Sequence, residues 1–216
     1  MTFSVETLKS GLTALDLPAD ERTLDRLTRF AALLLRWNKT YNLTAIRDES
    51  EVLTHHLLDS AALVPMLRRW APEAQRVLDV GSGGGLPAIP TAVLREDLAV
   101  HAVDTVKKKA TFLQQVQIEL GLRNFRAHHA RVESLQLLAF DVISSRAFAS
   151  LKDFTTLTEH LLAPSGLWFA MKGVVPEQEL AELPSFAKVR AILPLTVPGL
   201  PESRHLIILE RNGCCE

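Results

Sequence analysis

Apolar and polar residues alternate in two different ways along this chain, and the change falls near position 72. Residues 21–37 place their apolar side chains on one stripe at helical spacing, with arginines on the other faces. Residues 51–67 repeat this pattern, and Pro65 near their end is expected to kink or split the helix. Residues 1–72 are therefore predicted to form an N-terminal helical extension.

Beyond that point short β-rich runs alternate with helical stretches. Strands that alternate with helices predict βαβ units and a mostly parallel sheet. The last two runs flank a proline-rich turn at 198–201, which predicts an antiparallel hairpin at the sheet edge. The expected fold class is α/β, with a mostly parallel seven-stranded sheet in a domain of residues 73–216. The predicted strands are 77–80, 100–104, 125–129, 140–144, 168–171, 189–195 and 205–210.

Composition excludes several classes of protein. The 216 residues are 47% apolar and 23% charged with a formal net charge of −1, as in an ordinary globular domain. No basic stretch precedes an apolar run at the start, and no apolar run is long enough to cross a bilayer. Cys214 and Cys215 are adjacent, without the spacing of a metal site. We expect a cytoplasmic protein with no metal and no membrane contact.

Residues 77–90 hold the clearest chemical signal, a glycine bend behind the first predicted strand. Leu86 and Pro87 follow Gly85, which excludes the Gly-Lys-Ser/Thr of a P-loop. A dinucleotide fingerprint that starts at Gly81 and Gly83 requires a third glycine where Leu86 stands. Such a bend exposes backbone to a ligand, which makes Gly81 and Gly83 candidate cofactor contacts, although a tight strand-to-helix turn alone explains the same glycines.

Asp104 favours a ligand at this bend. It closes the next predicted strand 23 positions after Gly81, where an acidic residue accepts hydrogen bonds from ribose hydroxyls. The same carboxylate can cap the helix that follows. Asp79 adds a negative charge beside the bend, which suits a cationic sulfonium such as S-adenosylmethionine better than a pyrophosphate. These residues predict a methyltransferase-like variant of the Rossmann fold.

Several motifs recur in a fixed order from about residue 20 to residue 210 and point to one family. Together they resemble the ribosomal RNA small subunit methyltransferase G family, also called the glucose-inhibited division protein B family. The motifs are Trp37-Asn-Lys-Thr-Tyr-Asn-Leu-Thr44, His56-Leu-Leu-Asp-Ser60, Gly85-Leu-Pro87, Phe112-Leu-Gln-Gln-Val116, Arg131-Val-Glu133, Ser145-Arg-Ala-Phe-Ala-Ser150 and Lys172-Gly173.

The resemblance implies a Rossmann-like class I methyltransferase fold and an enzyme that uses S-adenosyl-L-methionine. Its reaction would methylate nitrogen-7 of guanosine 527 in 16S rRNA and release S-adenosyl-L-homocysteine. Its partner would be 16S rRNA within the small ribosomal subunit or an assembly intermediate, and we expect a monomer. Carried over by motif, the cofactor contacts are Gly81, Leu86, Val132, Glu133 and Arg146.

Nitrogen-7 of guanine carries an in-plane lone pair and no proton, so in-line methyl transfer to it needs no general base. Positioning and electrostatics then remain for the protein to supply. Arg146 follows the fourth predicted strand, at the edge where sites form in open α/β sheets. It can bind the cofactor carboxylate or donate to guanine oxygen-6. The structural alternative is an ion pair with Asp141 or Glu133.

Basic residues supply candidate RNA contacts. Lys107, Lys108 and Lys109 occupy the first turn of a predicted helix, where the macrodipole disfavours cations, so a phosphate is expected nearby. Lys39 and Arg47 flank the polar loop that contains Asn42. The arginines of residues 21–37 either contact phosphates or form a solvated helix face. Further candidates at predicted strand ends are Lys172, Arg204 and His205.

Some alternatives stay open at this point. His55, His56 and Asp59 have a helical spacing that can ligate a metal, but one helix without a further ligand favours a packing role. The glycine bend and Asp104 also occur in nicotinamide-dependent oxidoreductases, although the dinucleotide register fails here. A non-catalytic RNA-binding module is the third hypothesis, and the intact bend with Asp104 and Arg146 argues against it.

Overall fold

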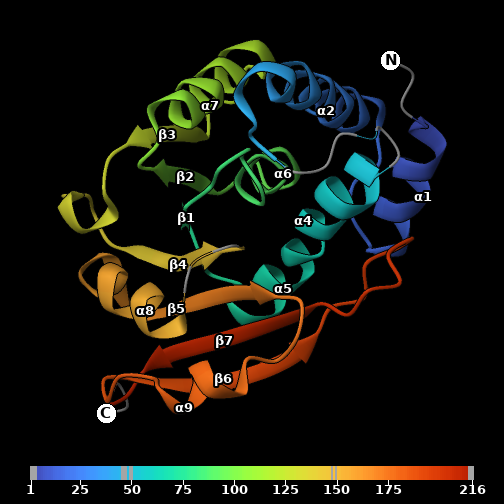
Figure 1. Ribbon diagram of the computed structural model, residues 1–216. Helices are drawn as coiled ribbons and strands as arrows, with labels where there is room; N and C mark the ends of the chain where they lie inside the picture. The colour runs from blue at the N-terminus through green and yellow to red at the C-terminus, as the bar shows by residue number, and fades with distance from the viewer. Residues whose placement is uncertain (1–3, 45–47, 49–50, 147, 149, 214–216) are drawn as a thin grey trace.

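A computed structural model describes residues 4–44, 48, 51–146, 148 and 150–213. Its centre is a seven-stranded sheet of order β3-β2-β1-β4-β5-β7-β6, with β1 to β5 parallel and β7 antiparallel to both neighbours (Figure 1). The predicted mostly parallel sheet with an antiparallel edge hairpin is thus confirmed. The strands are β1 (Arg76–Val80), β2 (Ala99–Asp104), β3 (Phe125–His129), β4 (Phe140–Ser145), β5 (Leu162–Lys172), β6 (Ala187–Pro194) and β7 (His205–Arg211).

Helices connect these strands much as the hydrophobic pattern predicts. Gly121 ends α7 in the left-handed conformation, with a φ of 62°. The short α9 lies in the segment between β5 and β6 and was not predicted, because none of its residues is buried and no apolar stripe marks it. The helical segments after β1 are α6 (Ala88–Leu94), α7 (Lys107–Leu120), η2 (Val132–Ser134), α8 (Leu151–Thr158), η3 (Glu159–Leu161) and α9 (Glu177–Ala181).

Strand β5 begins at Leu162, six residues before the predicted start. Pro164, Ser165 and Gly166 hide this part of the strand from a β-propensity argument. A Cβ on Gly166 would lie 3.0 Å from the carbonyl oxygen of Phe140 on β4, so glycine permits the two strands to approach here. The register between β4 and β5 also shifts between Phe140 and Val142.

The N-terminal region is helical, as predicted, but the predicted helix at 51–67 is broken into segments. A seven-residue π-helix, η1, leads into one α-helical turn, and Ala62, which keeps a right-handed helical conformation, separates this turn from α5. Pro65 lies within the first turn of α5, where its missing N–H is tolerated. The segments are α1 (Val5–Ala14), α2 (Glu21–Tyr41), η1 (Val52–Leu58), α4 (Asp59–Ala61) and α5 (Leu63–Trp70).

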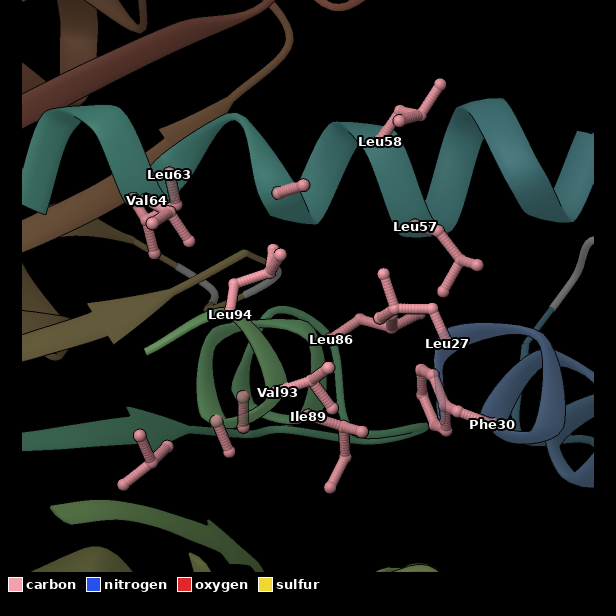
Figure 2. Close-up of a cluster of buried hydrophobic side chains, with 14 of the residues drawn as sticks. Leu27, Phe30, Leu57, Leu58, Leu63, Val64, Leu86, Ile89, Val93 and Leu94 are labelled. Atoms are coloured by element: carbon pink, nitrogen blue, oxygen red, sulfur yellow. The ribbon is translucent and has the colours of Figure 1, made fainter. Parts of the chain in front are cut away.

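One hydrophobic core joins the N-terminal helices to one face of the sheet. Figure 2 shows Leu27 and Phe30 of α2 beside Leu86 and Ile89 of the bend and α6, with Leu57 of η1 above them. A second core, which includes Leu151 and Phe154 of α8, covers the opposite face. The N-terminal helices thus share a buried core with the sheet layer.

The glycine bend is packed directly on this extension. A Cβ on Gly84 would lie 2.9 Å from Cδ1 of Leu34 in α2, so a larger residue here would require the buried Leu34 side chain to shift. The bend is therefore held between α2 and the sheet. Among the described residues, none of the helices is long and apolar enough to span a membrane.

Candidate active site

Two cavities lie at the carboxyl edge of the parallel strands. The first has a volume of about 480 Å³ and lies between the ends of β1 and β2 and the segment that contains η2. It brings together four of the predicted cofactor residues, which are Gly81, Asp104, Val132 and Glu133. It is also lined by Val80, Val103, Thr105, Val106, Lys109, Ala130, Arg131, Phe148 and Leu157.

The glycines of the bend adopt backbone conformations that other residues rarely take. Gly81, Gly83 and Gly85 have φ values of 68°, 57° and 84°. The amide of Gly81 donates to the carbonyl of Val103 on β2 at 2.9 Å, which closes the bend against the neighbouring strand. A Cβ at Gly81 would meet only the ring of Phe148, at 3.9 Å, so this part of the bend faces the first cavity.

Two predicted cofactor residues lie differently from Gly81. Gly83 does not line the first cavity, and its amide donates to Oδ2 of Asp104 at 3.0 Å. Leu86 is also absent from the lining, and its side chain, 5% exposed, packs in the core with Leu27 (Figure 2). Contact of the cofactor with Gly83 or Leu86 stays a prediction.

Asp104 organises the first cavity. Besides the bond from Gly83, its Oδ1 accepts from the amide of Val106 at 2.8 Å, directly before α7. Lys109 Nζ lies 4.0 Å from Oδ2. A carboxylate has about four lone-pair sites, so acceptors remain for ligand hydroxyls. Asp104 thus anchors the start of α7, which agrees with the capping role considered from the sequence. Its remaining lone pairs are still available for the other role, which is to accept hydrogen bonds from ribose hydroxyls.

Asp79 differs from its expected state. Its side chain is 1% exposed, and burial raises the pKa of Asp79 to about 7, against the opposing hydrogen bond from Ser144 at 3.2 Å. The nearby Arg146 guanidinium also favours the ionised form. The expectation of a full negative charge beside the bend is therefore wrong near pH 7, because a pKa of about 7 leaves the carboxyl group partly protonated there.

A second cavity of about 450 Å³ lies beyond β4, between the sheet and η1. Four predicted cofactor or RNA contacts meet there: Arg146, Lys172, Arg204 and His205. Arg146 lines this cavity while Phe148, two positions later, lines the first one. Two residues that are close in the sequence thus line different cavities. The other lining residues are Thr44, His55, His56, Asp59, Met171, Gly173 and Leu195.

Arg146 and Arg204 meet at one buried carboxylate. Arg146 Nη1 lies 3.1 Å from Oδ2 of Asp59, and Arg204 Nε lies 3.2 Å from Oδ1. The side chain of Asp59 is only 4% exposed. Both predicted structural partners of Arg146 are wrong. Asp141 instead accepts from the amides of residues 75 and 76, and Glu133 pairs with a neighbouring arginine at 2.7 Å.

His56 contributes a neutral ring to the wall of the second cavity. Burial, followed by the charge of Arg146, lowers the pKa of His56 to about 4. Its Nε2 contacts the hydroxyl of Thr44, and its Nδ1 lies 3.0 Å from the carbonyl oxygen of His55. Within the described residues no three His, Cys, Asp or Glu side chains form a metal-binding group.

Sequence reasoning assigned His56 and Asp59 to helix packing and so missed their place in this wall. The signal was the motif His56-Leu-Leu-Asp-Ser60 itself, which the resemblance had singled out. Two features decide which side chains line the cavity. One is the π-helical geometry of η1, which no residue pattern predicts, and the other is the loop between β6 and β7, which carries Arg204.

Other candidate RNA contacts lie away from the second cavity. Lys107 and Lys108 are exposed at the start of α7, and Lys39 is exposed near the end of α2. Asn42 ends α2 in the left-handed conformation. Arg47 lies outside the described residues.

Three of the four arginines of α2 contact other parts of the protein. Arg22 and Arg26 pair with Glu96 at 3.2 and 2.6 Å, and Arg29 donates to the carbonyl of Glu119 at the end of α7. These contacts tie α2 to the sheet domain and favour a structural role for these three residues. Arg36 is exposed, and for it the two roles considered from the sequence stay open.

Solved structures place this architecture in a class. The chain superposes on a Klebsiella pneumoniae protein assigned as an O-methyltransferase with a TM-score of 0.62, 16% identity and 94% coverage of both chains. It also superposes on a ribosomal protein L11 methylase from Lactobacillus delbrueckii subsp. bulgaricus, with a TM-score of 0.55, 18% identity, and 78% and 89% coverage. The fold is that of the class I methyltransferases, as predicted.

Sequence comparison then gives the family. The model for "rRNA small subunit methyltransferase G" matches residues 23–207. A ribosomal RNA small subunit methyltransferase G from Ralstonia nicotianae is 55% identical over 207 residues, which cover 94% of this chain and 93% of that protein. The chain belongs to the rRNA small subunit methyltransferase G family, and the resemblance drawn from the motifs is confirmed.

Proposed function

We propose that this enzyme uses S-adenosyl-L-methionine to methylate nitrogen-7 of guanosine 527 in 16S rRNA. The observation that carries the proposal is the pair of cavities at the carboxyl edge of the parallel strands, one lined by Phe148 and the other by Arg146. One cavity has the features of a nucleoside site, and the other presents paired arginines. Family membership supports the substrate.

The first cavity fits the cofactor. Gly81 presents backbone without a Cβ, Asp104 retains acceptor capacity for the ribose hydroxyls, and Phe148 offers a ring beside the bend. Val132 and Glu133 form the far wall after β3. When bound, S-adenosyl-L-methionine supplies an electrophilic methyl group and leaves as S-adenosyl-L-homocysteine. The residues of the chain hold the cofactor and exclude water.

The second cavity fits the acceptor base. Nη1 of Arg146 is held by Asp59 and by the carbonyl of His55, and Nη2 lies 3.4 Å from Nδ1 of His56. The guanidinium lines the cavity, where the N–H groups that these contacts do not use can donate to guanine oxygen-6. Arg146 is the residue we assign to this contact. Because nitrogen-7 has no proton, in-line transfer needs no general base, and the low pKa of His56 leaves that ring neutral at pH 7.

RNA outside the target nucleotide needs a wider surface. The RNA backbone next to the target nucleotide is proposed to contact three residues that line the second cavity, which are Lys172, Arg204 and His205. Lys39, Asn42, Arg47, Lys107 and Lys108 are proposed contacts for more distant phosphates. The acceptor would be the small ribosomal subunit or an assembly intermediate. We further propose that the enzyme works in the cytoplasm as a monomer, since one chain supplies both cavities.

The test supplies labelled S-adenosyl-L-methionine with naked 16S rRNA and with small subunits that lack this modification. We expect label on nitrogen-7 of guanosine 527, and loss of at least most of it with Arg146→Ala. Label on another base would contradict the proposed target. Tight binding of NAD in place of S-adenosyl-L-methionine would favour an oxidoreductase, and RNA binding without any transfer would favour a non-catalytic module.

A further inference from the structure

Glu179 lies on α9, outside every motif of the family resemblance, yet it contacts Lys172 of the second cavity and Leu151 at the start of α8. We propose that Glu179 is a positioning residue, which fixes both Lys172 and the start of α8. Lys172 lines the second cavity, which we call the acceptor cavity because the proposed function assigns it to the target base. The inference rests on the proposed function. It adds to that function a residue that orients the acceptor site without contacting the substrate.

One carboxylate makes three contacts. Oε2 of Glu179 accepts from the backbone amide of Leu151 at 2.7 Å. The ammonium of Lys172 lies 2.8 Å from the same oxygen and 3.0 Å from Oε1. The side chains of Lys172 and Glu179 are 19% and 28% exposed, so solvent screens this pair less than it screens an open surface pair.

The contact to Leu151 fixes a segment that matters to both cavities. Leu151 is the first residue of α8, and its amide is one of those that a helix leaves without an internal partner. Arg146 directly follows β4 and lines the second cavity, and Phe148, three positions before Leu151, lines the first. Glu179 therefore fixes the start of α8 close in sequence to both residues.

The contact to Lys172 changes what that lysine can do. Lys172 is the last residue of β5 and lines the acceptor cavity. With its ammonium held by two carboxylate oxygens, Lys172 retains a further N–H donor, while the pair of Lys172 and Glu179 has little net charge. Lys172 is thus suited to a directed hydrogen bond with the acceptor nucleotide rather than to a general attraction for phosphate.

The remainder of α9 gives Glu179 no other evident task. The helix has five residues, none of them buried, and its apolar Leu180 packs only partly buried against the second core. Glu177, in the same helix, is exposed and serves as a matched control. A role confined to holding α9 in place predicts a loss of stability alone, whereas a positioning role predicts a specific kinetic change.

The experiment compares Glu179→Ala, Glu179→Gln and the control Glu177→Gln in the full-length enzyme. The measurements are kcat, KM for RNA, the dissociation constant of S-adenosyl-L-methionine, and Tm. We expect Glu179→Ala to lower kcat about 10-fold and Glu179→Gln to fall between it and the unaltered enzyme, because the amide oxygen still accepts from Leu151. Glu177→Gln should match the unaltered enzyme.

A double-mutant cycle with Lys172→Ala tests the coupling. Because the two side chains act as one unit, the double variant should be no more than about twofold slower than the worse single variant. Multiplied effects in the double variant, wild-type kinetics in folded Glu179→Ala, or activity that only follows Tm would each overturn the inference.

Failure of the proposed function would look different, since the unaltered enzyme would then not methylate guanosine 527. The same cycle would in that case be measured on binding of 16S rRNA, where Lys172 still lines the cavity. Additive losses of RNA affinity would overturn the positioning role independently of the reaction.

Discussion

Nη1 of Arg146 lies 3.1 Å from the buried carboxylate of Asp59, although the two residues are 87 positions apart in the chain. Arg204, 145 positions from Asp59, reaches the other oxygen of the same carboxylate. An N-terminal helical turn therefore orients two cations that belong to the sheet. The acceptor cavity depends on this junction of three distant segments.

Asp59→Asn tests that dependence. The amide keeps the shape of the side chain but presents no charge to the two guanidinium groups. We expect kcat/KM for RNA to fall on the order of 30-fold, which corresponds to about 2 kcal/mol, the lower range for breaking a buried charge pair. Affinity for S-adenosyl-L-methionine, measured by calorimetry, should change less than about twofold because the first cavity lacks Asp59.

Asp97→Asn is the matched control. Asp97 also pairs with an arginine, Arg95, at 2.7 Å, but it is exposed and lines neither cavity. Its substitution should leave methylation unchanged. Equal losses in the two variants would contradict a specific role for Asp59.

Gly85→Ala should destabilise the protein more than Gly121→Ala does. Both glycines have positive φ values, 84° and 62°, so each alanine costs about 1 kcal/mol in backbone strain. A Cβ at Gly85 would also lie 2.7 Å from Cγ1 of Ile89 and 2.9 Å from Cδ2 of Leu113, whereas nothing lies within 4 Å at Gly121. This overpacking adds about 1–3 kcal/mol.

Urea denaturation measures both free energies of unfolding. Only Gly85→Ala should also weaken binding of S-adenosyl-L-methionine, since the bend forms part of the cofactor cavity. Equal destabilisation by the two alanines would show that the neighbours of Gly85 move aside without cost.

Asp79→Asn should change how stability depends on pH. The folded-state pKa of about 7 lies above the ordinary value of 3.8, so between these values the unfolded chain releases a proton that the folded protein keeps. Stability is thus lost as pH rises through this window, by up to about 1.4 kcal/mol per pH unit, and levels off above pH 7. Asparagine cannot ionise and should escape this loss.

The measurement is the difference in unfolding free energy between the variant and the unaltered protein at pH 5, 6, 7 and 8. We expect this difference to shift in favour of the variant by about 2 kcal/mol between pH 5 and 7. The pKa values of His56 and His101 are lowered to about 4, so these two residues destabilise the folded protein as pH falls below 6.5. This effect is present in both the variant and the unaltered protein and cancels in the difference. A difference independent of pH would disprove the raised pKa.

Lys108→Glu should weaken RNA binding and leave cofactor affinity unchanged. Lys108 is exposed in the first turn of α7 and lines neither cavity. Loss of one phosphate contact should reduce the slope of log affinity against log salt by about 1. Lys188→Glu at the amino end of β6 makes the same charge change at the opposite end of the sheet. If both variants bind RNA equally, the lysines of α7 have no specific contact.

Most of the fold follows from local patterns. All seven strands overlap the β-rich runs that predict them. In central strands such as β1, β4 and β7 burial leaves a continuous apolar run, whereas the edge strands β3 and β6 are mostly exposed or half-buried. The start of β5 at Leu162 and the helix α9 escape this logic. Proline and glycine interrupt the first, and the second buries no residue, so hydrophobic periodicity carries no information about either.

The two halves of the site differ in how far the sequence predicts them. Gly81 and Asp104 occupy fixed places relative to two neighbouring strands, so strand order alone brings them together. Asp59 and Glu179 meet their partners through side-chain contacts between distant segments, and no spacing along the chain encodes such a meeting. Asp79 was placed correctly, but its protonation depends on complete burial, which only the packed structure reveals.

Because Gly84 of the bend packs on Leu34 of α2, a chimera that transfers the acceptor specificity of this enzyme must take this contact into account. The N-terminal region supplies Thr44, His56 and Asp59 to one wall of the acceptor cavity, while the cofactor cavity is built from the sheet domain. A chimera that exchanges only residues around the acceptor wall inherits the old support for the bend. A chimera that exchanges the whole N-terminal region must supply a helix that packs on Gly84 as Leu34 of α2 does. Without that packing the glycine bend loses its support, and the cofactor cavity changes along with the acceptor cavity.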